Sequence, residues 1–581
     1  MQRKETVCEI ANQRDKNTSG GMKLSTLQLS YDHYYTYAEI ESFLDLAVQL
    51  FPRLAEKISI GKSQENRDIW CLVLTNQETG CHMQKPAIYI DGNIHAGEVT
   101  ASHVCMHTIA SLLHGFGQDI NITHLLNHRT WYIIPRVNPD GAEVYLHSPF
   151  MLRSVTRKNP DWEDRIDGAL YPEDLDGDGL VRFMRVKDSL GIFKVSSKDS
   201  RLLIPRLPGD FEGEFYNIYL EGLIHHYQGG PITPAPDQWH LDMNRNFPSG
   251  WQATQRGGGA FPLSEPEALA MVKFIQDHPN IGALQAFHTM SGAILRPSGN
   301  TPDKSLPKTD VMAYKELGKI GEEVTGYPCV SILEGFTGDP IYGVFVDWSY
   351  EHKGLLGFST ELWDPLQQAG KTGKKNFTEH SFSEEDELLK LKWNDETLNG
   401  EAFMPWTKFN HPQLGEVEIG GWHPKHFAQN PWLSRLQDEC ERNHAFNLKH
   451  AAALPELVVE RLDIRTESDG IYTITLDIAN RGWLPTNVTT KALQLKVVND
   501  VYARIDGDIE LITGQEKEIL GQLDGFMMAR EGWYTFGRAG YQRNMRKRVT
   551  WTVRKSKSDA KLRILVHSDR AGIHQLEETL T

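Results

Sequence analysis

The stretch AIYIDGNIHAGE, residues 87–98, joins a short apolar run to a glycine turn, a histidine and a glutamate. The run AIYID is typical of a buried strand, and the turn after it would present His95 and Glu98 at the strand's carboxyl end. One imidazole and one carboxylate at this spacing can serve as two of the three protein ligands of a catalytic zinc ion. The pattern is weak alone, because a glutamate near a helix N-terminus is also favoured by the helix dipole.

Apolar runs alternate with helical patterns on either side of this stretch. The segment 36–51 places apolar residues on one helical face, and a second helix is predicted after Glu98. Ser264 and Glu267 match a capping box, in which each side chain bonds the other's backbone N–H, and open a helix through residue 275. Strands are predicted at residues 131–135, 281–287 and 354–359. This alternation predicts an α/β fold with a mostly parallel or mixed central sheet flanked by helices.

Other reactive side chains follow other predicted strands. His288 directly follows the strand 281–287, Glu361 follows the run 354–360, and Asn244-Arg245 lies in HLDMNRNF. In open α/β sheets, ligands gather at the carboxyl ends of the strands, so these residues could converge. Two histidines and a glutamate would bind zinc, and a second glutamate is what a metal-dependent hydrolase needs as a general base.

Several motifs occur in an order and at spacings that resemble one enzyme family. They are YYTYAEIESFL (34–44), ISIGKSQENRDIW (58–70), NIHAGE (93–98), VNPDG (137–141), DMNRNF (242–247), SEPE (264–267), FHTMSG (287–292), VDWSY (346–350) and TELWD (360–364). On these motifs the chain resembles the zinc carboxypeptidase A family (peptidase family M14), as a bacterial-type member with a long insertion and a C-terminal β-domain. The resemblance covers roughly residues 34–364 and extends up to about residue 450.

The resemblance implies a role for each matching residue. His95, Glu98 and His288 would bind one Zn²⁺, and Asp242 would orient the first histidine. Glu361 would take a proton from the attacking water and return it to the leaving amine. Arg153 would stabilise the oxyanion. Asn244 and Arg245 would bind the substrate's terminal carboxylate, which would confine cleavage to the last peptide bond.

Three positions depart from the family pattern or concern specificity. The family's catalytic-site tyrosine would fall at Asp339, so Tyr342 either fills that role from a shifted loop or is an ordinary tyrosine. Val346, at a position that helps form the family's side-chain pocket, argues against a basic C-terminal residue. Arg296 could favour an acidic group in the same region, or it could form a structural ion pair.

Composition changes along the chain predict three segments. Residues 1–30 read as a flexible polar tail, residues 31–454 as the catalytic domain, and residues 455–581 as a β-sandwich of short alternating strands. The catalytic domain contains an insertion at about 154–240, rich in glycine, proline and charge, which could narrow the active-site cleft. Within it, Asp174, Asp176 and Asp178 could bind Ca²⁺, although Arg185 occupies the place of the bidentate glutamate, and a tight acidic turn is the alternative.

The overall composition limits the partners. Lysine and arginine number 61 against 77 aspartates and glutamates, giving a net charge of −16 that disfavours nucleic acid. No apolar run approaches about 18 residues, so no membrane span is expected. The six scattered cysteines and the absence of a signal-peptide pattern predict a cytoplasmic protein with reduced thiols.

These patterns predict a zinc metallocarboxypeptidase that hydrolyses the C-terminal peptide bond of peptides. One alternative is an amidase or deacylase of the same family, acting on cell-wall peptides or on small amidated or acylated amino acids. A non-catalytic binding protein on the same fold is the other, and the presence of both histidines, Glu98 and Glu361 disfavours it. The sequence leaves the oligomeric state open.

Overall fold

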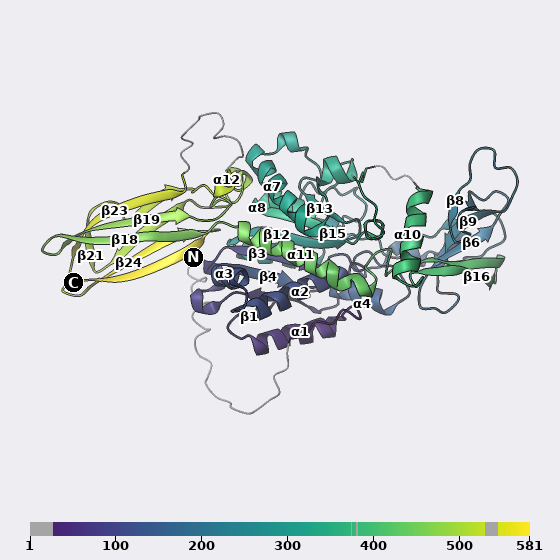
Figure 1. Cartoon of the computed structure of the whole chain (residues 1–581), viewed down its shortest axis with the longest axis horizontal. Helices are drawn as coiled ribbons and strands as arrows, with labels where there is room; N and C mark the ends of the chain where they lie inside the picture. The colour runs from purple at the N-terminus through teal and green to yellow at the C-terminus, as the bar shows by residue number, and fades with distance from the viewer. Residues whose placement is uncertain (1–26, 374, 379–381, 529–543) are drawn as a thin grey trace, which may run out of the picture.

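A mixed eight-stranded sheet forms the centre of the computed structural model, which describes residues 27–373, 375–378, 382–528 and 544–581 (Figure 1). Its four middle strands, β4, β3, β12 and β15, run parallel to one another, whereas β2 and β13 beside them are antiparallel. The predicted tail falls mostly outside the described residues, and Leu27 is buried. In spatial order the strands are β1 (Ala55–Lys62), β2 (Asp68–Leu74), β4 (Thr130–Ile134), β3 (Ala87–Gly92), β12 (Ile281–Thr289), β15 (Leu356–Leu362), β13 (Ala293–Arg296) and β14 (Cys329–Ser331).

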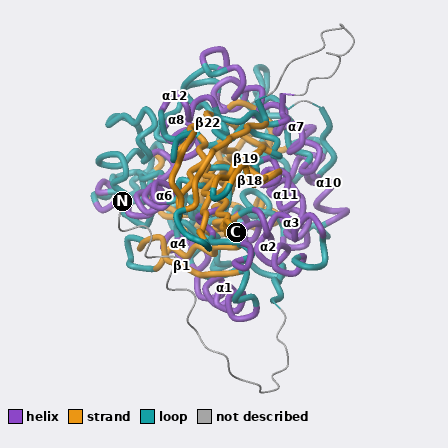
Figure 2. Tube along the Cα trace, turned by 90° about the vertical axis from the view of Figure 1, so that its left-hand side faces the viewer, coloured by secondary structure: helices purple, strands orange, loops and turns teal. Residues whose placement is uncertain are grey.

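Helices cover both faces of the sheet and bury a separate apolar core on each (Figure 2). Because side chains alternate along a strand, Ile88 and Ile90 of β3 join one core while Ala87 and Tyr89 join the other. The first face carries α1 (Tyr37–Leu50), α2 (Thr100–Gly115), α3 (Ile120–His128), α7 (Lys308–Thr325) and α11 (Leu433–Ala453). The second face carries α6 (Pro266–Asp277) and α8 (Phe345–Lys353).

The helix predicted after Ser264 is present, but its predicted cap is wrong. The helix α6 begins at Pro266 with Glu265 as the N-cap residue. Ser264 Oγ instead donates to Glu265 Oε1 at 2.9 Å and accepts from Asn246 at 3.0 Å. Glu267 accepts the backbone N–H of Gln64 at 2.9 Å. Tertiary partners therefore replace the local capping bonds at this helix end.

Glu267 should make stability depend on pH. Its side chain is buried, and burial together with nearby Asp140 and Glu265 raises its pKa from 4.5 to about 7. The folded state therefore holds this proton after the unfolded chain has lost it, and stability falls as pH rises from about 4.5 to 7. Over that pH range, the shift lowers the free energy of unfolding by about 3 kcal/mol. Thermal melts should show Glu267→Gln stabilising the protein at pH 8 much more than at pH 5; an equal gain at both values would contradict this.

The inserted segment is an ordered β-structure. Its strands pair with a hairpin from residues 403–422, for which the sequence analysis predicted no role, and Arg185 forms an ion pair with Glu418 at 2.7 Å across that junction. The helix α10 (Glu384–Thr397) lies beside this sheet (Figure 1). In spatial order the six strands are β16 (Phe403–His411), β17 (Gly415–Trp422), β6 (Phe183–Lys187), β9 (Phe215–Leu220), β7 (Phe193–Val195) and β8 (Leu203–Pro205). A smaller sheet contains β10 (Gly222–Ile224), β5 (Ala169–Pro172) and β11 (Thr233–Pro234).

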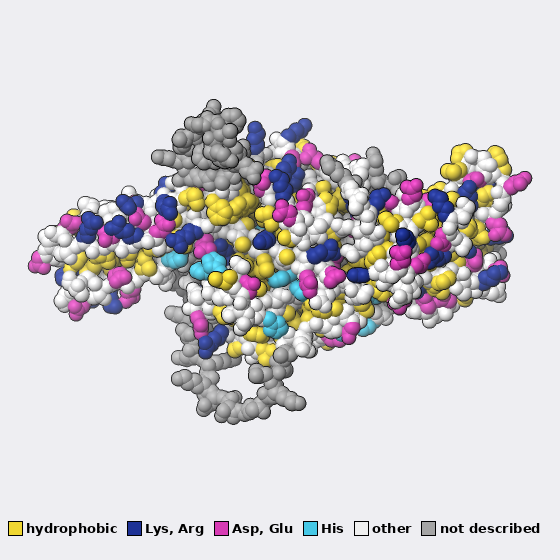
Figure 3. All heavy atoms as spheres, viewed as in Figure 1, with side chains coloured by type: hydrophobic (Ala, Val, Ile, Leu, Met, Phe, Trp, Pro, Cys, Tyr) yellow, Lys and Arg dark blue, Asp and Glu magenta, His cyan; other side chains and the backbone are white. Residues whose placement is uncertain are grey.

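The C-terminal region consists of two four-stranded antiparallel sheets around their own apolar core, which includes Trp551. One sheet contains β18 (Leu457–Ser468), β19 (Ile471–Asn480), β23 (Arg546–Lys555) and β21 (Ile509–Thr513). The other contains β22 (Lys517–Gly521), β20 (Val501–Gly507), β24 (Ala560–Ser568) and β25 (Gly572–Leu580). On the face in Figure 3, acidic and basic side chains are interspersed over this region and the rest of the chain. Among the described residues, no helix combines the length and apolarity needed to cross a membrane.

The C-terminal sheets dock at the amino ends of the central strands. Arg129, which precedes β4, donates to Leu454 O at 3.2 Å and to Glu456 at 3.0 Å. A Cβ added to Gly282, near the start of β12, would lie 2.9 Å from Leu454. The insertion lies at the other end of the molecule (Figure 1). The carboxyl ends of the central strands, where reactive side chains were expected, therefore face the insertion.

Candidate active site and metal centre

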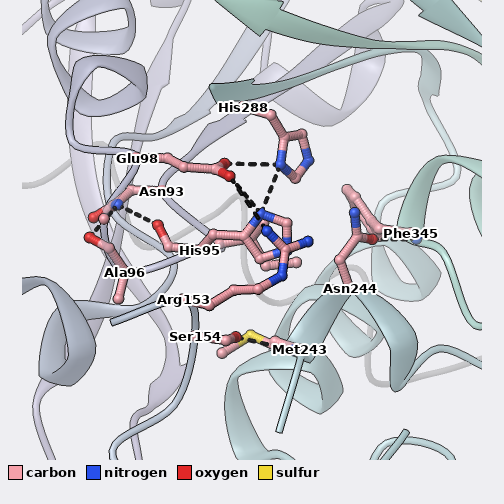
Figure 4. Close-up of polar contacts among 12 residues, drawn as sticks. Asn93, His95, Ala96, Glu98, Arg153, Ser154, Met243, Asn244, His288 and Phe345 are labelled. Carbon is pink, nitrogen blue, oxygen red and sulfur yellow. Dashed lines mark hydrogen bonds and ion pairs between the residues drawn. The ribbon is translucent and has the colours of Figure 1, made fainter. Parts of the chain in front are cut away.

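Three side chains from two distant parts of the chain converge at the carboxyl edge of the sheet (Figure 4). His95 and Glu98 lie in the turn between β3 and α2, and His288 lies near the end of β12. Nδ1 of His95 lies 2.8 Å from Glu98 Oε1, and Nδ1 of His288 lies 2.9 Å from Glu98 Oε2. The two Nδ1 atoms are 3.1 Å apart. Two imidazole nitrogens and a carboxylate facing one point fit the donor set of zinc.

Asn93 and Asn430 hold the turn that carries His95 and Glu98. Asn93 adopts a positive φ of 63° and donates to the carbonyl oxygens of His95 and Ala96 at 2.7 and 3.1 Å. Asn430 is fully buried and donates to Gly97 O at 2.8 Å. The sequence analysis missed both residues. Asn93 carried a local signal, because asparagine tolerates the left-handed conformation, whereas nothing local connects Asn430 to a turn more than 300 positions earlier.

Asp242 links His95 to Arg153. It accepts from His95 Nε2 at 3.0 Å through one oxygen and from Arg153 Nε at 2.8 Å through the other. The His95 ring is thereby oriented with Nδ1 towards Glu98 and His288. Burial alone would raise the pKa of Asp242, but His95 and Arg153 outweigh it and hold that pKa well below its usual value. Asp242 therefore stays an anion that can accept from both groups.

Glu361 lies beside these groups on the next strand. It stands opposite His288 in the parallel pairing of β12 and β15, so both side chains lie on the same side of the sheet. Burial and the nearby carboxylate of Glu98 raise the pKa of Glu361 to about 8. Opposing charges lower the pKa of Glu98 itself, since His95 and His288 outweigh the effect of its burial. The site thus contains one anionic carboxylate among the converging donors and one that readily accepts a proton.

Asn244 and Arg245 lie on the short helical turn η4 (Met243–Arg245), directly after Asp242. The backbone N–H of Phe345 donates to Asn244 Oδ1 at 2.8 Å, which orients the amide. Arg245 donates to Asn244 O at 2.8 Å. Gly343 allows this close packing, because a Cβ there would lie 2.1 Å from Arg245 O. The amide and guanidinium are therefore held beside Asp242 at one side of the site.

Comparison with known proteins identifies the family. A family model described as zinc carboxypeptidase matches residues 40–176 and 230–395, more than half of the chain. The chain belongs to this family. The predicted family and α/β fold class are thereby confirmed, and the gap between the two matched ranges falls within the predicted insertion. A second model, described as a domain of unknown function, matches residues 456–579.

Individual members of the zinc carboxypeptidase family are similar over the same region. Carboxypeptidase A5 of Macaca fascicularis is 26% identical over 357 residues, which cover 59% of this chain and 63% of that protein. Carboxypeptidase A1 of Mus musculus is 25% identical over 345 residues, covering 59% and 65%. The chain thus spans just under two thirds of the length of these relatives. The crystal structure of thrombin activatable fibrinolysis inhibitor (TAFI) is 20% identical with a TM-score of 0.42, covering 72% of this chain and 74% of that one.

Three further positions in this family member were predicted to act on the substrate. Arg296 forms a bidentate ion pair with Asp303 at 2.5 and 2.7 Å, the structural alternative considered from the sequence. Val346 lies on α8 and is buried in the apolar core on that face of the central sheet. The ring of Tyr342 packs against Gly250, where an added Cβ would lie 2.8 Å from it. Roles for these three residues in the reaction stay predictions.

The acidic turn of the insertion satisfies its carboxylates internally. Asp174 accepts the backbone N–H groups of Gly177 and Gly179 at 2.8 and 2.9 Å, and Asp176 accepts that of Asp178 at 3.1 Å. Asp178 itself pairs with Arg182. The Ca²⁺ interpretation is therefore not supported, and the alternative of a tight acidic turn accounts for these contacts.

A second group of metal-binding residue types lies on the insertion surface. His225, His226 and Asp167 each offer an atom within 4.8 Å of the others, and His226 Nδ1 lies 2.9 Å from Asp167 Oδ1. The sequence alone does not reveal this group, because Asp167 lies 58 positions before the first of the two adjacent histidines. Asp174, Asp176 and Glu221 form a third such group among the described residues, so metal measurements on this protein must separate three groups.

Proposed function

We propose that the protein is a zinc metallocarboxypeptidase that removes the last residue of peptides with a free C-terminal carboxylate. The observation that carries the proposal is the convergence of His95, Glu98 and His288 within 3.1 Å, beside a second glutamate and two arginines. When bound there, zinc supplies Lewis-acid chemistry: it polarises the scissile carbonyl and lowers the pKa of water. The other steps fall to side chains of this chain.

Glu361 would move the proton. As a carboxylate it takes a proton from the attacking water, and as the acid it returns that proton to the leaving amine. A raised pKa suits both steps, because a group that titrates near the working pH both accepts and donates readily. The positive charge of a bound metal would lower the pKa of Glu361 and so oppose this rise. The half-buried position of Glu361 limits competing exchange with bulk water.

The two arginines would bind opposite ends of the reacting unit. Arg153 is held by Asp242 with its side chain still 55% exposed, so it can donate to the negative oxygen that forms at the scissile carbonyl. Arg245 and Asn244 would bind the terminal carboxylate, since a guanidinium matches that group in charge and geometry. A substrate fixed at this end would place its last peptide bond at the zinc donors.

Hydrolysis of blocked dipeptides tests the proposal. The zinc-loaded protein should cleave an N-acetyl dipeptide with a free carboxylate and leave its C-terminal amide uncleaved. Cleavage of both would favour the amidase alternative. Zinc binding without cleavage of any substrate in a panel of C-terminal residues would favour the non-catalytic alternative.

Arg245→Ala should lower kcat/KM for the free-carboxylate substrate by about 10- to 100-fold, the loss expected for a hydrogen bond to a charged group. Steady-state kinetics with the exposed-arginine variant Arg53→Ala as control would measure it. The control should match the wild type. An unchanged kcat/KM in Arg245→Ala would show that this side chain does not bind the carboxylate.

A further inference from the structure

A cavity of about 960 Å³ opens between the insertion and the candidate active site. Arg153, Asp242 and Arg245 form one side of it. The opposite side comes from the insertion, through Ile218 and Leu220 of β9 and through Ile232, which directly precedes β11. The cavity is thus continuous with the proposed reaction site, and Ile218 and Leu220 on its far wall lie outside the two ranges that match the zinc carboxypeptidase family.

The far wall is apolar. Phe150 and Trp239 line it with their rings in an edge-to-face arrangement, 6.0 Å between centroids. The charged groups around the cavity are largely paired, because Arg153 contacts Asp242 and Arg256 contacts Asp237. Arg245 is the remaining arginine of the lining, and under the proposed function it binds the terminal carboxylate. A ligand that fills the rest of the cavity should therefore be uncharged and apolar.

The direction of the substrate follows from the two arginines. With the carboxylate at Arg245 and the scissile carbonyl at Arg153, the chain on the amino side of the bond continues past Arg153, where the insertion strands lie. The volume is near the upper end of the range for pockets that hold drug-sized ligands, roughly 300–1,000 Å³, and exceeds what one side chain needs. An extended apolar group bound there would remove the wall's apolar surface from water, which favours binding.

We propose that this cavity binds a large apolar group on the amino side of the scissile bond, so that the enzyme prefers peptides or acylated amino acids carrying such a group. The preference rests on the proposed function for the direction of the substrate. Leu220 is the residue best suited to test it, because it lines the cavity while 44% exposed, so a substitution there disturbs little packing.

The kinetic test uses two substrates that share one C-terminal dipeptide and carry either an acetyl or an octanoyl group. The wild type should show a kcat/KM at least 10-fold higher for the octanoyl substrate. Leu220→Arg should remove most of that preference while changing the acetyl substrate less than about 2-fold, and Leu220→Met should retain it. Leu207→Arg is the matched control, because Leu207 is an exposed leucine of the insertion, 61% accessible, that does not line the cavity. Equal kcat/KM values for the two substrates, or equal losses on both in Leu220→Arg, would overturn the proposal.

A binding test separates this inference from the proposed function. Calorimetry with the zinc-loaded Glu361→Gln variant measures the Kd of both substrates without turnover. A Kd at least 10-fold lower for the octanoyl substrate, abolished by adding Leu220→Arg, would support the cavity as the binding site even if the wild type cleaved neither substrate. Equal Kd values would overturn it whether or not the protein is a carboxypeptidase.

Discussion

Glu361→Gln should lower kcat by about 10³- to 10⁴-fold, near the top of the range for loss of a general acid–base group. Glutamine keeps the shape of the side chain but can neither take a proton from water nor return one to the leaving amine. Zinc content should be unchanged, because Glu361 lies outside the three donors that converge within 3.1 Å. KM should change little, since the groups proposed to bind the substrate's carboxylate are Asn244 and Arg245.

The measurement pairs steady-state kinetics on a blocked dipeptide with metal analysis of the same preparation. Glu323→Gln is the matched control, because Glu323 is an exposed glutamate of α7 that undergoes the same chemical change. The control should retain wild-type kcat. If Glu361→Gln kept its kcat with zinc bound, another group would have to move the proton, and the assignment of the base would be wrong.

The sequence predicted the convergence of the site because simple rules relate strand order to position. His95, His288 and Glu361 each follow or end a middle strand of the sheet, and parallel neighbours bring their carboxyl ends to one edge. The helix α1 was equally predictable from the sequence. Ile40, Phe43, Leu44 and Ala47 of its apolar face are buried, and Thr36 and Glu39 form a capping box. These signals lie within a few residues of the feature they predict.

What the sequence could not supply were contacts between distant segments. The insertion reads as irregular because β7, β8, β10 and β11 span only two or three residues, too few for a period to appear, and β6 pairs with β17 from more than 200 positions later. Ser264 matched a capping motif, yet its hydroxyl forms hydrogen bonds with Asn246 and Glu265 instead. Asn430 holds the turn that carries His95 and Glu98 through a hydrogen bond to Gly97 O. Each outcome depends on a tertiary partner that local patterns do not encode.

His288→Ala should abolish tight zinc binding, and it gives the second large effect expected for this protein. Wild-type protein should gain thermal stability on adding zinc, because an ion that binds only the folded state stabilises it by about 4 kcal/mol at 1,000 times its Kd. The variant should lose that gain, since one imidazole and one carboxylate leave the ion only two protein ligands. Asp242→Asn should be milder, weakening affinity by about 10- to 100-fold through the orientation of His95.

Titration with zinc, followed by melting temperature and metal content, distinguishes a lost ligand from a damaged fold. Zinc-free His288→Ala should melt close to zinc-free wild type, whereas a structural role for His288 would lower the melting temperature of both forms. The surface group of His225, His226 and Asp167 could bind zinc as well, so His225→Ala/His226→Ala is measured in parallel. That double variant should keep both the zinc-induced stabilisation and the hydrolytic activity. If the double variant lost them and His288→Ala did not, the functional ion would bind on the insertion instead of at the carboxyl edge of the central sheet.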